Sequence, residues 1–101
     1  MNLLLDQQEA KIIAEQYQFL IGQKLGFKPY KDAVINKIEP ILEGDNDYKV
    51  ISKAVYKVPE IMPELTQEPE YREVSIDLFD LIFIKRLPIL FDLDDLILAK
   101  S

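Results

Sequence analysis

The sequence predicts an α+β domain, with a mostly α-helical fold as the alternative. Three observations lead to this prediction: an amphipathic helix with an N-terminal cap, two segments of strand character joined by a turn, and a strongly apolar segment in the last third of the chain. A chain of 101 residues has the length of one domain, so we expect residues 1–101 to form a single small globular unit.

The spacing of apolar residues predicts a helix over residues 7–25. Asp6 is a good N-cap residue and Glu9 follows three positions later, which is the arrangement of a capping box. Gly26 suits the position just after a helix, and Pro29 prevents any continuation. The apolar residues that follow helical spacing are Ala10, Ile13, Ala14, Tyr17, Leu20, Ile21 and Leu25.

Residues 33–42 are predicted to form the first strand of a β-hairpin. The segment is rich in β-branched residues, and Pro40 would break a helix interior. The same proline implies that the strand lies at an edge of the sheet or contains a bulge. A helix that begins at Pro29 is the alternative for residues 30–43, because several apolar residues there also fit a helical period.

Residues 48–58 are predicted to form the second strand, after a turn over residues 43–47 that is rich in Gly, Asp and Asn. Apolar and aromatic residues alternate along this segment with Lys49, Lys53 and Lys57. This alternation is typical of a strand with one buried face and one solvated face.

The last third of the chain is predicted to contain a loop, a strand and a short helix. Three Pro-Glu dipeptides fall within residues 59–73 and predict a long surface loop, since proline removes backbone donors. Residues 74–86 are apolar on every side of a helical wheel, which favours a buried third strand that completes a small antiparallel sheet. Aspartates at the start and a lysine at the end predict a short C-terminal helix over residues 92–100.

The net charge of −6 is confined to the second half of the chain. Residues 1–57 carry eight lysines and eight acidic residues, whereas residues 58–101 carry four basic and ten acidic residues. We expect no nucleic-acid partner, because such binding requires a basic surface. No apolar stretch has the length of a membrane span or of a signal peptide, so no membrane contact is expected and a cytoplasmic location is predicted.

The composition argues against an enzyme. The chain has no histidine, which is the commonest general base, and no cysteine, which supplies the thiol nucleophile of many enzymes. No cofactor is expected, because the three glycines do not form a phosphate-binding loop. No metal site is expected either: an EF-hand that begins at Asp45 would need glycine at its sixth position, where the chain has Val50.

The leading interpretation is a non-catalytic, acidic protein-binding module of the inhibitor, immunity-protein or adaptor type, in a bacterium or its phage. Its partner is predicted to be another protein with a basic surface, which the acidic residues would attract. The alternative is a homo-oligomeric structural or assembly subunit, such as a homodimer, that uses the apolar segment 74–91 as its interface. The candidate partner-binding residues are Glu60, Glu64, Glu68, Glu70, Asp92, Asp94 and Asp95.

Overall fold

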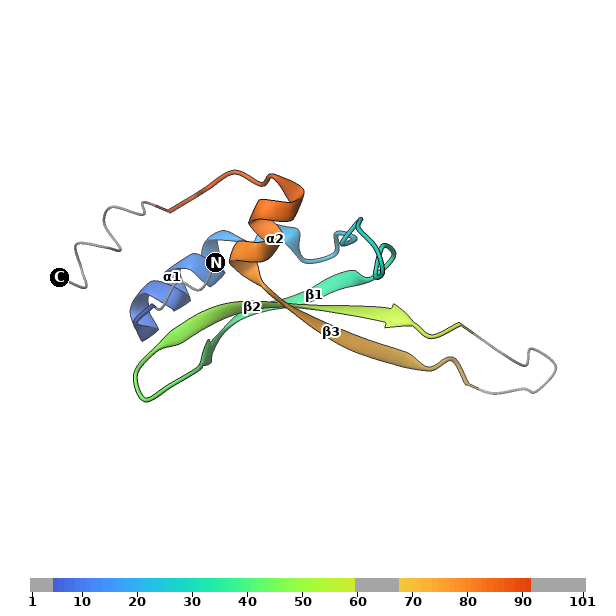
Figure 1. The fold of residues 1–101 in the computed structure, drawn as a ribbon, viewed down its shortest axis with the longest axis horizontal. Helices are drawn as coiled ribbons and strands as arrows, with labels where there is room; N and C mark the ends of the chain where they lie inside the picture. The colour runs from blue at the N-terminus through green and yellow to red at the C-terminus, as the bar shows by residue number, and fades with distance from the viewer. Residues whose placement is uncertain (1–4, 60–67, 92–101) are drawn as a thin grey trace.

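The structure, a computed structural model, describes residues 5–59 and 68–91, which form a three-stranded sheet with two helices on one side (Figure 1). The strands follow one another as an antiparallel meander in the order β1-β2-β3. Helix α1 packs over β1 and β2, and helix α2 packs over β2 and β3. The elements in chain order are α1 (Gln7–Gln16), the 3-10 turn η1 (Gln18–Leu20), β1 (Val34–Leu42), β2 (Tyr48–Lys57), β3 (Tyr71–Asp77) and α2 (Leu78–Lys85). The predicted α+β class, with a helix before and after the sheet, is confirmed.

Helix α1 begins at the predicted capping box but ends earlier than predicted. The Glu9 amide donates to Asp6 Oδ1 at 2.7 Å, and the Asp6 amide donates to Glu9 Oε1 at 2.9 Å. The helix stops at Gln16 instead of residue 25, and Gly22 then adopts a φ of +94° that glycine accepts without strain. Residues 22–25 run alongside β1, which supplies the backbone hydrogen bonds that a longer helix would have made.

The hairpin of β1 and β2 is confirmed, so the helical alternative for residues 30–43 is wrong. Pro40 lies on β1, an outer strand of the sheet. Proline has no backbone N–H, and an outer strand has no further strand beside it that would need this donor. On β2, Val50, Ser52 and Ala54 are buried. Lys49, Lys53 and Lys57 alternate with these residues on the opposite side of β2, as predicted. That side is only partly solvated, because Lys49 and Lys53 are half-buried and Ile51 between them is buried.

The prediction of one strand across residues 74–86 is wrong for its second half. Strand β3 begins at Tyr71, within the predicted loop, and ends at Asp77, after which residues 78–85 form α2. The physical reason is a local cap: Asp77 Oδ1 accepts a hydrogen bond from the Phe79 amide at 2.9 Å and starts the helix. The third strand is therefore an outer strand, and β2 is the central one.

The core lies between the helices and the sheet. Tyr17 and Leu20 from the region of α1, together with Leu78 and Leu81 from α2, are completely buried there. Residues 60–67, which include most of the predicted Pro-Glu loop, and the predicted helix at 92–100 lie outside the described residues. Neither helix of the described ranges has the length and apolar character that crossing a bilayer requires.

Candidate functional site

The apolar segment 74–91 divides into a half that enters the core and a half that faces outward. Leu78, Phe79, Leu81 and Ile82 are buried on the sheet side of α2. Four other large apolar side chains between residues 83 and 90 are exposed to between 42% and 73%. We call them the outer apolar set: Phe83, Ile84, Ile89 and Leu90. Contiguous patches of exposed apolar side chains are typical of protein-binding surfaces, and these four side chains lie within residues 83–90.

Tyr17 holds the segment that carries half of this set. Its hydroxyl donates to the Pro88 carbonyl at 2.6 Å and accepts from the Leu90 amide at 3.0 Å. Burial raises the pKa of Tyr17, and the hydrogen bond from the Leu90 amide partly offsets this effect. The Phe91 ring packs edge-on against Tyr17 and Phe79, at centroid distances of 6.3 and 5.4 Å. The residues after α2 are thus tied to the end of α1 by hydrogen bonds and by ring packing.

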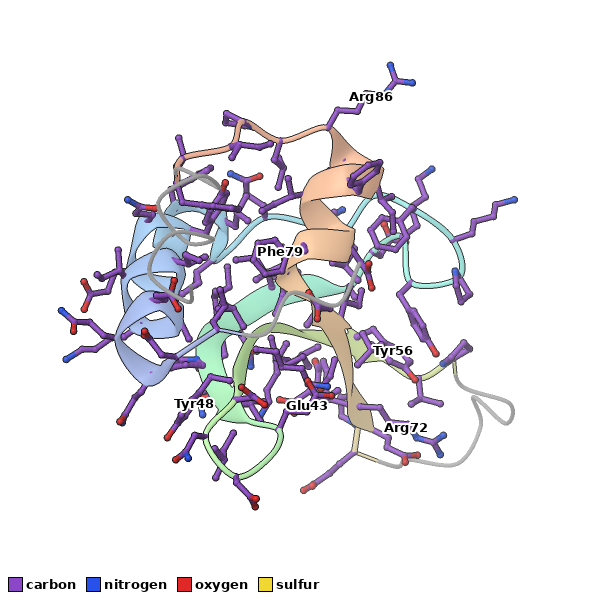
Figure 2. All side chains as sticks on the ribbon, turned by 60° about the vertical axis from the view of Figure 1, so that its left-hand side comes forward. Glu43, Tyr48, Tyr56, Arg72, Phe79 and Arg86 are labelled. Carbon is purple, nitrogen blue, oxygen red and sulfur yellow. The ribbon has the colours of Figure 1, made fainter. Side chains whose placement is uncertain are left out.

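The C-terminal end of α2 is fixed by two further interactions. The Leu87 amide donates to the Ile82 carbonyl at 3.0 Å, across Arg86 in the left-handed conformation (φ 53°), as in a Schellman motif. The Lys85 ammonium donates to the carbonyls of Lys24 and Leu25 at 3.1 and 2.8 Å. In Figure 2 the Arg86 side chain projects away from the body of the protein, whereas Phe79 lies on the side of α2 that faces α1.

The acidic residues predicted to bind a partner are only partly placed. Glu68 and Glu70 are exposed and directly precede β3, and Glu70 Oε1 pairs with Arg72 Nε at 3.2 Å. The seven residues of β3, which span about 20 Å at the usual rise per residue, separate them from α2. The structure therefore does not bring these two glutamates together with the outer apolar set. The other five residues, Glu60, Glu64, Asp92, Asp94 and Asp95, lie outside the described ranges.

The sheet face opposite the helices carries charge of both signs. Lys53 and Glu39 form an ion pair of 2.9 Å between β2 and β1. Their hydrogen bond lowers the pKa of Glu39 and raises the pKa of Lys53, because it stabilises the charged form of each group. Lys49 pairs similarly with Glu43 at 3.2 Å. Two lysines of this face are therefore neutralised by neighbouring carboxylates.

The comparisons with known proteins give no family for this chain. No protein-family model, no curated protein and no solved structure matches it. Within residues 5–59 and 68–91, no group of three or more acidic side chains is arranged to hold a metal ion.

Sequence reasoning found the segment of the outer apolar set but not its members. The signal was present, because a helical wheel of residues 78–84 is apolar all round, and such a helix must expose apolar side chains when only one side packs on a sheet. The role of Tyr17 had no local signal. Its hydroxyl partner Pro88 lies 71 residues away in the chain.

Proposed function

We propose that this protein is a non-catalytic protein-binding module and that the outer apolar set forms the centre of its binding surface. The observation that carries the proposal is the exposure of four large apolar side chains in one ordered stretch of the chain. Phe83 and Ile84 lie on helix α2, and Ile89 and Leu90 lie on the segment that Tyr17 holds in place. Burial of one large apolar side chain contributes roughly 1.5–3 kcal/mol, so a partner that covers several of them gains a substantial driving force. A segment that is already ordered also loses less conformational entropy on binding.

The acidity of residues 58–101 supports a partner with a basic surface. Glu68 and Glu70 are exposed, and a negative potential accelerates the encounter with a positively charged protein. Small size, the lack of histidine and cysteine, and localised acidity suit an inhibitor, an immunity protein or an adaptor. A cytoplasmic location is part of the proposal, because a chain without cysteine needs no oxidising compartment for disulfide formation.

The proposal is tested by partner capture from a lysate of the native host, at low and at high salt. Wild type is compared with Phe83→Ser/Ile84→Ser, which removes two members of the outer apolar set. The matched control is Ile12→Ser/Leu42→Ser, which removes two side chains of similar exposure, 47% and 54%, from α1 and β1. We expect a partner that the wild type and the control capture, that the Phe83/Ile84 variant does not, and whose recovery falls with salt. Capture of no partner, or equal capture by both variants, would refute the proposal.

The second candidate function is a homo-oligomeric structural subunit that buries the outer apolar set against another copy. The same exposed side chains favour it, because interfaces between identical subunits are more apolar than those of transient complexes. Sedimentation of the purified protein at micromolar concentration separates the two candidates. A dimer that Phe83→Ser/Ile84→Ser dissociates would favour the subunit, whereas a monomer would exclude it.

A further inference from the structure

The two outer edges of the sheet differ in how they are protected. Along β1, residues 22–25 cover the first part of the edge: the Ile35 amide donates to the Gln23 carbonyl at 2.9 Å. Further along, the Gln18 side-chain amide donates to the Ile38 carbonyl at 3.0 Å, and Pro40 has no amide to offer. Covering segments and prolines are common means by which proteins prevent pairing at a sheet edge.

The outer edge of β3 lacks these protections. The Val58 amide donates to the Glu70 carbonyl, and this hydrogen bond shows which residues of β3 direct their backbone groups towards β2 and which direct them outward. Even-numbered residues of β3 bond to β2, so Tyr71, Glu73 and Ser75 direct their amides and carbonyls outward. Among the described residues none forms a backbone hydrogen bond with these outward groups, and β3 contains neither proline nor glycine.

Beyond the end of β3, the same edge of β2 is already paired with another segment, so among the described residues β3 is the part of this edge that remains without a neighbouring strand. Beyond Asp77 the chain leaves the sheet for α2, and Leu5 occupies the adjacent position beside β2. Leu5 and Tyr48 exchange two backbone hydrogen bonds of 3.0 and 2.7 Å. Within the part of the chain that the structure describes, β3 is therefore the strand at which the sheet can be extended.

We propose that a second copy of this chain pairs with β3, strand against antiparallel strand, across a twofold axis. In the combined sheet the helices of both copies should cover the same face. Because side chains alternate between the two faces of a strand, even-numbered residues must then lie opposite even-numbered ones, and odd-numbered opposite odd-numbered. A register centred on Glu73 would place Glu73 against itself, and one centred on Ser75 would place Glu73 against Asp77. Both registers bring like charges together, which destabilises a cross-strand pair.

The register centred on Val74 avoids every like-charge pair. Val74 then lies opposite Val74 of the second copy, on the face that carries the helices, and Glu73 lies opposite Ser75. The other opposed pairs are Arg72 with Ile76 and Tyr71 with Asp77. Arg72 and Tyr71 are exposed in the single chain, and Figure 2 shows Arg72 projecting from the distal part of β3. The product is a six-stranded antiparallel sheet, made from three strands of each copy.

This dimer is independent of the proposed partner surface, since it uses the backbone edge of β3 and not the outer apolar set. A contact built on one strand edge belongs to the small class of interfaces, below about 1,200 Å². We therefore expect a weak dimer that forms in the micromolar range or above.

The register can be tested by charge at Ser75. This residue is exposed on β3 and lies opposite Lys53 of β2 within the same chain. Ser75→Glu places glutamate against Glu73 of the second copy at two symmetric positions, whereas the matched variant Ser75→Lys places lysine there. Within one chain Ser75→Glu places a glutamate opposite Lys53, which favours the fold. The substitution should therefore weaken the dimer without destabilising the single chain.

The experiment is sedimentation equilibrium over a concentration series that reaches the millimolar range. We expect the dissociation constant of Ser75→Glu to rise, and that of Ser75→Lys to fall, by about 2- to 30-fold, from two cross-strand charge pairs of the usual strength. The swap Glu73→Lys/Ser75→Glu restores opposite charges and should again strengthen the dimer.

Circular dichroism checks that each variant remains folded. A wild type that is monomeric over the whole series would overturn the proposal. The same holds for a dimer whose dissociation constant moves in one direction in both Ser75 variants, or that only Phe83→Ser/Ile84→Ser dissociates.

Discussion

Replacing Tyr17 by phenylalanine should loosen the segment that carries Ile89 and Leu90 while leaving the core filled. The change deletes one hydroxyl, which donates to the Pro88 carbonyl and accepts from the Leu90 amide. A hydrogen bond contributes about 0.5–1.5 kcal/mol net. Because Pro88 and Leu90 are exposed enough for water to replace the hydroxyl, we expect the free energy of unfolding to fall by about 1–2 kcal/mol, towards the lower part of the range for two bonds.

Two measurements check the effect. Urea unfolding followed by circular dichroism gives the change in the free energy of unfolding, with Tyr56→Phe as the matched control. The Tyr56 hydroxyl makes no hydrogen bond with a described residue, and its ring contacts Tyr30, so this control should stay within about 0.5 kcal/mol of wild type. Hydrogen exchange of the Leu90 amide should accelerate in Tyr17→Phe more than exchange in β2 does. Equal stability of Tyr17→Phe and Tyr56→Phe, with unchanged exchange at Leu90, would refute the assigned role of Tyr17.

The same interaction predicts a pH dependence. Burial raises the pKa of Tyr17 above its ordinary value of 10.0, so the folded protein holds this proton more tightly than the unfolded chain does. The resulting stabilisation is complete below about pH 10 and is lost as the pH rises through the higher pKa of the folded state. The stability difference between wild type and Tyr17→Phe should therefore shrink in strongly alkaline solution. A difference that grew with pH would contradict this assignment.

The predictions for three further residues concern stability and can be measured by urea unfolding. Asp77→Ala should lower the free energy of unfolding by about 1 kcal/mol and Asp77→Asn by less, because asparagine keeps the oxygen that accepts from the Phe79 amide. Burial raises the pKa of Asp77, so the wild type should gain stability relative to Asp77→Asn as the pH falls through the carboxylate range, and a loss would contradict this. Arg86→Gly should raise the free energy of unfolding by about 1 kcal/mol, since glycine accepts the φ of 53° without strain; a decrease would show that the arginine side chain stabilises the helix end. Ser52→Ala should raise it by up to about 1 kcal/mol, because the buried Ser52 Oγ has no hydrogen-bond partner among the described residues, and a clear loss would show that the hydroxyl makes a stabilising hydrogen bond.

The elements that sequence reasoning predicted correctly are those whose signals are local. The capping box of Asp6 and Glu9 fixed the start of α1, because its hydrogen bonds join residues three positions apart. The hairpin was predictable because lysines alternate along β2 with the residues of its buried face. Pro40 correctly indicated an outer strand.

The errors arose where packing between distant segments decides the structure. Leu25 is buried as predicted, yet it reaches the core from an extended segment that bonds to β1, so the apolar spacing alone could not show where α1 ends. Residues 78–85 are apolar on all sides, and periodicity cannot distinguish a buried strand from a helix in that case. The deciding signal was Asp77, which caps α2 and could have been interpreted as an N-cap.

The candidate site was only partly accessible to sequence reasoning. The segment 74–91 was predicted to be core or interface, and it contains residues of both kinds. Which side chains face outward depends on how α2 lies on β2 and β3, and no pattern within the segment contains that information. The role of Glu68 and Glu70 in binding stays a prediction.

The central claim is that this protein acts by binding another protein through the outer apolar set. The most direct test is the affinity for a captured partner, measured by titration calorimetry with wild type, Phe83→Ser/Ile84→Ser and the control Ile12→Ser/Leu42→Ser. If the outer apolar set is the centre of the interface, the first variant should lose at least about tenfold in affinity and the control less than about threefold. Equal affinities of the two variants would contradict the claim.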